Sequence, residues 1–227
     1  MKCIILAAGP TLGGSYMFPP NSKPKCLFHY EGEVILEHTV NVLRKCGVAD
    51  VIVVTGYKNE MIEQFNKERG LGLTLIHNPA GASDRRGSGW REGYKSIRLG
   101  LKGIDEDVII TVGDLWLMER GFFQLLGSKE RLIIGRGGHG LQMFKIGREY
   151  LPKLRLARGR GCVRLLYRFC MVEKGAKGFH CENNVYTGIK GQRQLVKGYY
   201  LELKGIRDID WYWQTDEGIA AGAKKRT

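Results

Sequence analysis

Residues 6–27, LAAGPTLGGSYMFPPNSKPKCL, contain a loop rich in glycine and proline that lies between an apolar run and two lysines, Lys23 and Lys25. The apolar run, Lys2–Ala8, predicts a strand that is buried on both faces of a sheet. A glycine-rich loop after such a strand commonly binds phosphate through its backbone N–H groups. The stretch therefore predicts the first strand of an α/β fold, followed by a phosphate-binding loop.

Strand and helix patterns alternate through the first half of the chain. Short apolar runs predict strands, and apolar residues at helical spacing predict helices. A strand–helix alternation of this kind predicts a mostly parallel sheet with helices on both faces, which binds ligands beyond the carboxyl ends of its strands. We expect further strands at Val51–Thr55, Leu73–His77 and Asp107–Val112, and helices at Val34–Cys46 (ended by Gly47), Asn59–Arg69 (capped by Asn59) and Trp90–Lys102.

The second half is less regular. No linker or internal repeat interrupts it, so we expect one α/β domain over residues 1–227, with three layers and a basic sub-lobe inserted before the last strand. The expected strands are Arg131–Gly135, Gly140–Lys145 and Tyr199–Leu203, and the expected helices are Gly147–Leu154, Arg160–Val172 and Thr215–Ala223.

The net charge of +13 is concentrated in one segment. Residues 128–207 contain 18 lysines and arginines against five acidic residues, and the rest of the chain is balanced. A local excess of this size favours an anionic partner over a merely solvated basic face. No apolar run is long enough to span a bilayer, and the six cysteines lack metal-binding spacing. These features predict reduced thiols and a cytoplasmic protein without a membrane span.

Two familiar phosphate-binding loops do not fit the stretch after Gly9. A Walker A loop needs a lysine after its last glycine, and Ser15 occupies that position. A dinucleotide fingerprint needs a second glycine where Thr11 stands, and it opens a helix that the prolines of residues 17–24 exclude.

A third loop fits better. LAAG at residues 6–9, followed by PKCL at 24–27, resembles the signature of the sugar-phosphate nucleotidyltransferase superfamily, LAAG-x-G-x-R and then P-K-x-L. TVGDLWL at residues 111–117 and IRDIDW at 206–211 resemble the two acidic strand ends of that family, in the same order. The resemblance covers most of the chain and implies a Rossmann-like sheet of the GT-A type. It also implies a nucleotide-binding half at residues 1–127, a basic acceptor-binding half at 128–207 and a closing segment at 208–227.

The resemblance also implies roles for individual residues. Asp114 and Asp210 would hold one Mg²⁺ or Mn²⁺ ion, because hard cations prefer carboxylate oxygens. Lys25 would neutralise charge on the reacting phosphates and, with the two aspartates, would form the catalytic set. The expected nucleotide-binding residues are Leu6, Ala7, Ala8, Gly9, Lys25, Asn78, Ser88 and Gly113, and the expected acceptor-binding residues are Arg155, Arg158, Arg160, Arg164, Glu182 and Trp211.

The signature loop departs from the family at two positions. Thr11 and Gly13 stand where the family has glycine and arginine. The missing arginine would remove a bidentate contact to the triphosphate. Either another basic residue replaces it, such as Lys23 or the arginines of residues 85–91, or the donor is not a triphosphate.

Three functions are compatible with these residues. The first is an Mg²⁺-dependent nucleotidyltransferase, which joins a nucleoside triphosphate to a phosphorylated sugar or alcohol and releases pyrophosphate. The alternative is a glycosyltransferase of the same fold, which uses a nucleotide-sugar and an anionic polymer such as modified DNA. The third is a degenerate relative that only binds nucleic acid, against which the retained Lys25, Asp114 and Asp210 argue.

Overall fold

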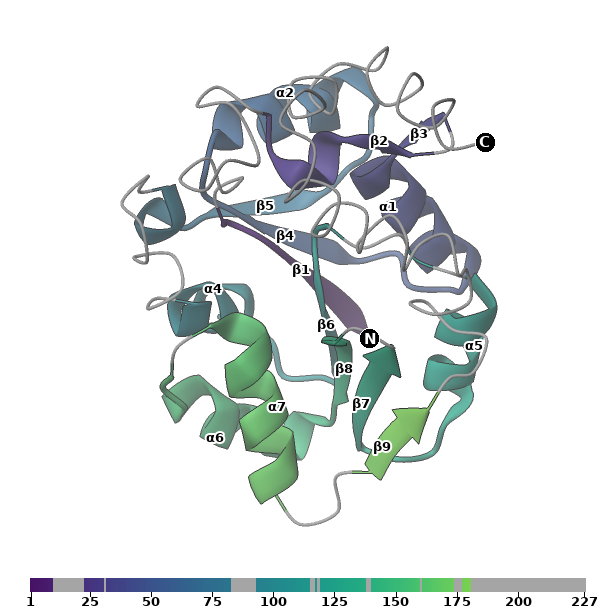
Figure 1. Cartoon of the computed structure of the whole chain (residues 1–227), viewed down its shortest axis with the longest axis vertical. Helices are drawn as coiled ribbons and strands as arrows, with labels where there is room; N and C mark the ends of the chain where they lie inside the picture. Colours follow the sequence, from purple (N-terminus) through teal and green to yellow (C-terminus); the bar gives the residue numbers. More distant parts are fainter. Residues whose placement is uncertain are drawn as a thin grey trace, which may run out of the picture.

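The computed structural model describes residues 1–9, 23–30, 32–82, 93–114, 117, 119–137, 140–159, 161–173 and 177–180. Within these residues a seven-stranded sheet forms the centre of the fold (Figure 1). Six strands run in one direction, and β8 runs antiparallel to its two neighbours. The order across the sheet is β5 (Thr74–His77), β4 (Val51–Thr55), β1 (Lys2–Ala7), β6 (Val108–Val112), β8 (Gly140–Ile146), β7 (Leu132–Gly137) and β9 (Lys177–His180).

Strand β1 lies inside the sheet and pairs in parallel with β4 on one side and β6 on the other. Its side chains alternate between two separate apolar cores. Cys3 and Ile5 belong to one core, and Ile4 and Leu6 belong to the other. The continuous apolar run at the start of the sequence is explained by this burial on both faces.

Helices cover both faces of the sheet, as the alternating pattern predicts (Figure 1). Helices α1 (Ile35–Lys45), α2 (Asn59–Glu68) and α5 (Glu119–Gly127) contribute to the core that contains Cys3. Helices α4 (Gly93–Gly100), α6 (Leu151–Leu156) and α7 (Cys162–Val172) contribute to the core that contains Ile4. The mostly parallel three-layer α/β fold is therefore confirmed.

Short elements complete the described part. They are the 3₁₀ turns η1 (Lys25–Leu27), η2 (Pro79–Ala82) and η3 (Arg148–Tyr150), and a small hairpin of β2 (His29–Tyr30) and β3 (Glu33–Val34). None of the helices within the described ranges is long and apolar enough to cross a membrane. The five cysteines placed by the structure have free thiols.

The predicted strands and helices within the described residues correspond to observed elements with small shifts at their ends, but the helix expected at Gly147–Leu154 is divided into η3 and α6. Helix α5 and the β2–β3 hairpin were not predicted. Gly47 follows the end of α1 with φ +82°, as expected of a glycine at that position. The cap of α2 is predicted wrongly: the capping residue is Lys58 in the left-handed conformation, and the Asn59 side chain instead donates to Glu63. Strand β9 was not predicted. The strand expected at 199–203 and the helix expected at 215–223 lie outside the described residues.

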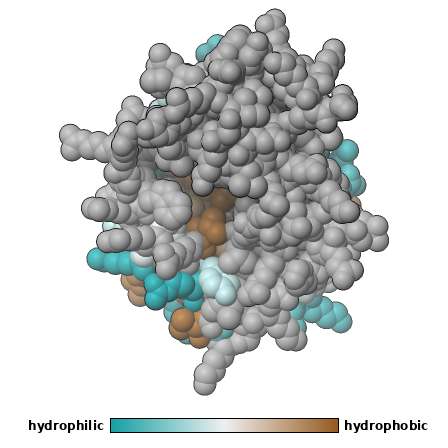
Figure 2. All heavy atoms as spheres, viewed as in Figure 1, coloured by the Kyte–Doolittle hydropathy of each residue, from teal (hydrophilic) through white to brown (hydrophobic). Residues whose placement is uncertain are grey.

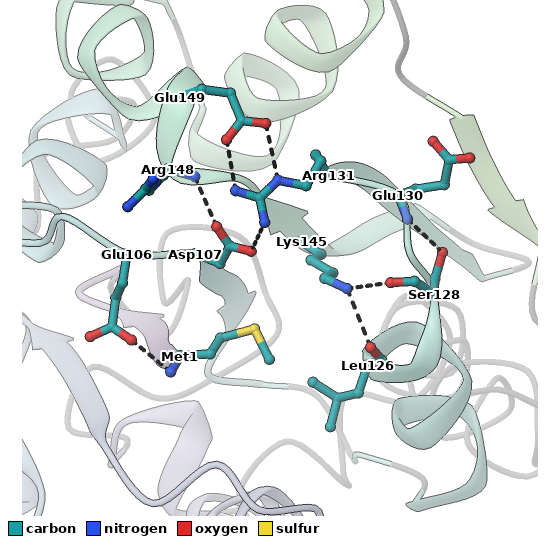
Figure 3. Close-up of polar contacts among 10 residues, drawn as sticks. All are labelled: Met1, Glu106, Asp107, Leu126, Ser128, Glu130, Arg131, Lys145, Arg148 and Glu149. Atoms are coloured by element: carbon teal, nitrogen blue, oxygen red, sulfur yellow. Dashed lines mark hydrogen bonds and ion pairs between the residues drawn. The ribbon is translucent and has the colours of Figure 1, made fainter.

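The described part of the basic segment is built into the main sheet. It supplies β7, β8 and β9 and the helices α6 and α7. Some of its cations hold this structure together at the amino ends of β6 and β7 (Figure 3). Arg131 contacts both Asp107 and Glu149, and Lys145 donates to the backbone oxygens of Leu126 and Ser128 at the end of α5.

Figure 2 shows the same face of the molecule with all atoms drawn. Apolar residues of the described part are visible near the centre of this face, and hydrophilic ones lie below them.

Replacing Phe144 by alanine tests the contribution of the core that contains Ile4 to stability. Phe144 is 1% exposed on β8, opposite Ile110 of β6. We expect Phe144→Ala to lower the free energy of unfolding by about 3–5 kcal/mol, because it removes buried apolar contacts and leaves a cavity. Urea denaturation measures this change. Phe123→Ala is the matched control, since Phe123 is 49% exposed on α5. Equal losses in the two variants would contradict this account of the core.

Candidate functional site

Lys25 is presented by the turn η1, which follows Pro24. The turn is closed by two backbone hydrogen bonds, from Leu27 to Pro24 and from Phe28 to Lys25. Cys26, Leu27 and Phe28 are buried, so the turn is anchored in the core and Lys25 remains partly exposed. Burial, together with the charge of Asp114, raises the pKa of the Cys26 thiol to about 12, so this neighbour of Lys25 stays protonated.

Asp114 lies in the turn directly after β6. The preceding residue, Gly113, donates its N–H to the carbonyl oxygen of Leu6, which fixes the turn beside the end of β1. A Cβ atom at Gly113 would lie 2.9 Å from the Cβ of Ala7. Only glycine fits there without displacement, so the Gly-Asp pair reflects the close approach of two neighbouring strand ends.

The Lys25 ammonium contacts the Asp114 carboxylate. The two residues are 89 positions apart in sequence, and their side chains are 24% and 31% exposed. Burial opposes ionisation of Asp114, but the charge and hydrogen bond of Lys25 and a backbone hydrogen bond outweigh it and lower the pKa of Asp114. The carboxylate is therefore ionised at neutral pH, at the carboxyl edge of the sheet where this fold class binds ligands.

The beginning of α7 lies within electrostatic reach of this pair. Burial raises the pKa of the Cys162 thiol, and the negative charge of Asp114 adds to the effect. The beginning of α4 packs against the same place, because a Cβ atom at Gly93 would lie 2.4 Å from the backbone nitrogen of Cys162. The first turns of α4 and α7 therefore meet beside the pair.

The structure describes all but one of the predicted nucleotide-binding residues. Leu6, Ala7, Ala8 and Gly9 form the end of β1 and its exit, beside Gly113. Asn78 is 2% exposed, and its side chain donates to Ser96 and accepts from Ala80 N–H. It thus supports the turn after β5. Ser88 lies outside the described residues.

The predicted acceptor-binding residues are only partly described. The Arg155 guanidinium donates to the backbone oxygens of Leu101 and Ile104, which gives this side chain a structural contact with the end of α4. Arg158 is exposed after α6, and Arg164 belongs to α7. Arg160, Glu182, Asp210 and Trp211 lie outside the described residues, so their roles stay predictions.

Sequence reasoning did not single out His38, which lies in α1. One ring nitrogen lies 2.8 Å from Glu33 and the other 2.8 Å from the carbonyl oxygen of Leu117, three residues after Asp114. The sequence carries no signal for this contact, because a lone histidine in an amphipathic helix is usually a packed or surface residue.

The described residues have the chemistry of a partial Mg²⁺ site. They contain no cluster of three or more metal-ligating side chains. Mg²⁺, however, usually binds through one or two carboxylates together with substrate phosphates and water. An ionised, partly exposed Asp114 at the carboxyl edge of the sheet fits this requirement.

Residues 3–174 match the family described as the MobA-like NTP transferase domain. The chain belongs to this family. The match covers the strand ends and the helices that surround Lys25 and Asp114. It confirms the resemblance, found in the sequence, to the class of nucleotidyltransferase domains.

Two curated relatives agree with this class. The chain is 26% identical over 136 residues to a CTP:phosphoglutamine cytidylyltransferase from Campylobacter jejuni, covering 59% of this chain and 51% of the relative. It is 37% identical over 78 residues to a choline-phosphate cytidylyltransferase from Haemophilus influenzae, covering 34% of this chain and 32% of the relative. The chain thus spans about half or less of the length of these relatives.

Solved structures share the fold. The CTP:phosphocholine cytidylyltransferase from Streptococcus pneumoniae superimposes with a TM-score of 0.61 at 16% identity, covering 88% of this chain and 98% of that one. A Mycobacterium tuberculosis protein solved with manganese superimposes with a TM-score of 0.55 at 15% identity, covering 79% and 87%. Neither comparison supports the predicted glycosyltransferase or nucleic-acid partner.

Replacing Lys25 by methionine tests the electrostatics of the pair. In the folded wild type, the pKa of Asp114 is lowered, so its ionised form contributes stability above the ordinary aspartate pKa of about 4, and this contribution is lost as the pH falls. In Lys25→Met, the backbone hydrogen bond of Asp114 remains to oppose burial but both effects of Lys25 are lost, so the pKa of Asp114 rises and the ionised carboxylate contributes less stability at neutral pH.

An NMR titration of the Asp114 carboxyl carbon measures this pKa. Lys23→Met is the matched control, because Lys23 lies over the Phe28 ring, 6.0 Å from its centre. An unchanged Asp114 pKa in Lys25→Met would show that the ion pair does not control this carboxylate.

Proposed function

We propose that the protein is a metal-dependent nucleotidyltransferase that joins a nucleoside triphosphate to a phosphorylated alcohol or sugar. The observation that carries the proposal is the Lys25–Asp114 pair at the carboxyl edge of a parallel sheet, in a chain of the MobA-like NTP transferase family. The names of the relatives, both cytidylyltransferases that act on phosphorylated compounds, support a triphosphate donor and make CTP the first one to test.

The reaction is a single displacement at phosphorus. A phosphate oxygen of the acceptor forms a bond to the α-phosphorus, and the bond to the oxygen bridging the α- and β-phosphates breaks. Pyrophosphate leaves with the electron pair, and no covalent enzyme intermediate is needed. Catalysis of this kind depends on positioning and on stabilising the negative charge that moves onto the leaving group.

The residues of the site divide this task. Asp114, with Asp210 as the expected second ligand, would hold the metal ion, which neutralises phosphate charge and orients the triphosphate when bound. Lys25 is close enough to Asp114 to contact the same phosphates as a compact cation. In the absence of substrate, the pair keeps both groups charged in a partly buried place.

The basic segment supplies an acceptor site in this proposal. Cys162, the first residue of α7, is close enough to Asp114 for the aspartate charge to affect its pKa. The exposed Arg158 lies in the connection between α6 and α7. A phosphorylated acceptor carries about two negative charges, so a few of these cations suffice to bind it. Arg155 is left out of the site, because its guanidinium is engaged by two backbone oxygens.

Pyrophosphate release tests the proposal. ATP, CTP, GTP and UTP are each incubated with Mg²⁺ and either phosphocholine or glucose 1-phosphate. We expect release with one donor–acceptor pair, and a loss of about 10²–10³-fold or more in Asp114→Asn, since the metal ligand is weakened. Asp210→Ala is expected to lose activity to a similar extent.

Asp50→Asn is the matched control, because the Asp50 side chain is 71% exposed and its carboxylate lies 3.9 Å from the Lys2 ammonium. Circular dichroism checks that each variant is folded. Nearly full activity in Asp114→Asn would remove the assignment of this residue, and hydrolysis of a nucleotide-sugar without pyrophosphate release would favour the glycosyltransferase instead.

A further inference from the structure

His38 contacts both the hairpin that follows Lys25 and the segment that follows Asp114. It lies on α1, with its side chain 20% exposed. Its Nδ1 lies 2.8 Å from a carboxylate oxygen of Glu33, and its Nε2 lies 2.8 Å from the carbonyl oxygen of Leu117. Glu33 belongs to the hairpin that follows Lys25, and Leu117 belongs to the segment that follows Asp114.

The contact with Leu117 fixes the role of one ring nitrogen. A carbonyl oxygen only accepts hydrogen bonds, so Nε2 carries the hydrogen and donates it. The Leu117 side chain is fully buried in the same core as Leu36 and Val40 of α1. Both the backbone and the side chain of Leu117 are therefore held against α1.

Asp114 lies between two fixed points of the backbone. On one side, Gly113 N–H donates to Leu6 at the end of β1, with a nitrogen–oxygen distance of 3.0 Å. On the other side, His38 holds Leu117. Leu117 is thus the nearest described anchor on the carboxyl-terminal side of Asp114, three positions along the chain.

Lys25 is connected to the same helix through the chain itself. The turn η1 leads into the β2–β3 hairpin, and Ile35 N–H at the start of α1 donates back to Phe28. Glu33, on β3, is the second partner of His38. The imidazole thus lies between the hairpin that continues from Lys25 and the segment that continues from Asp114.

We propose that His38 is a positioning residue that sets the Asp114 carboxylate for metal binding by holding the carbonyl of Leu117. This inference rests on the proposed function. It predicts that the hydrogen-bond donor at Nε2 matters more than the size or the aromatic character of the side chain.

Two substitutions separate the donor from packing. In His38→Gln the side-chain amide nitrogen can replace Nε2 as a donor to Leu117, whereas His38→Leu fills the space and donates nothing. Asn41→Leu is the matched control, because Asn41 is exposed on the same helix. The thermal midpoint of unfolding is recorded for each variant.

The first measurement is the dissociation constant for Mn²⁺ without nucleotide, from the electron paramagnetic resonance signal of the free ion. We expect about a tenfold or larger weakening in His38→Leu and a change of less than about threefold in His38→Gln and Asn41→Leu, since groups that orient metal ligands typically affect affinity by this much. The KM for the metal–triphosphate complex should likewise rise more in His38→Leu than in His38→Gln or Asn41→Leu.

The second measurement is hydrogen exchange of the Asp114 and Leu117 amides, which does not depend on any activity. Faster exchange in His38→Leu but not in His38→Gln supports the proposal, and wild-type exchange in His38→Leu overturns it. Equal losses of metal affinity in the Leu and Gln variants would also overturn it. A wild-type protein that binds no Mn²⁺ and releases no pyrophosphate would instead overturn the proposed function.

Discussion

The structure depends on the parallel pairing of β1 with β4 on one side and β6 on the other. Because β1 is buried on both faces, its register is fixed by two cores at once, and a slip by one residue would exchange the side chains of those cores. This pairing brings the exits of β1 and β6 together. The hydrogen bond from Gly113 to Leu6 and the close approach of Gly113 to Ala7 are direct results of that register.

The ion pair of Lys25 and Asp114 also depends on this strand pairing, because the pairing fixes the end of β6 that carries Asp114. Neither residue belongs to a strand. Asp114 follows β6, and Lys25 begins the turn η1, whose other residues are buried in the core. Burial alone would favour the neutral carboxyl, and the nearby ammonium reverses that preference. The pair thus keeps the Asp114 carboxylate ionised in a partly buried place, which is the state that the proposed metal binding requires.

Much of this arrangement was predictable from the sequence. Apolar runs such as Val51–Thr55 identify central strands, since burial on both faces leaves few polar residues in them. The glycine before Asp114 and the lysine after Pro24 were identified from motifs. Strand β9 escaped notice because its sequence, Lys177–His180, contains glycine and charge and lacks the apolar alternation of a strand.

Other features depend on tertiary contacts that a local pattern does not encode. Asn59 has the chemistry of a helix cap, but the chain enters α2 one residue earlier through a left-handed Lys58. The positive charge of Arg155 looks like part of an anion site, whereas the carbonyls of Leu101 and Ile104 accept its hydrogen bonds. The contact of His38 with the backbone oxygen of Leu117 joins residues 79 positions apart in sequence.

The backbone contact between Gly93 and Cys162 has a consequence for how such a site changes during evolution or engineering. It locks the first turns of α4 and α7 together, so the segments that lead into the two helices end at points of fixed separation. Engineering that is to preserve this helix contact should therefore keep Gly93, and also Gly161, where a φ of +71° favours glycine.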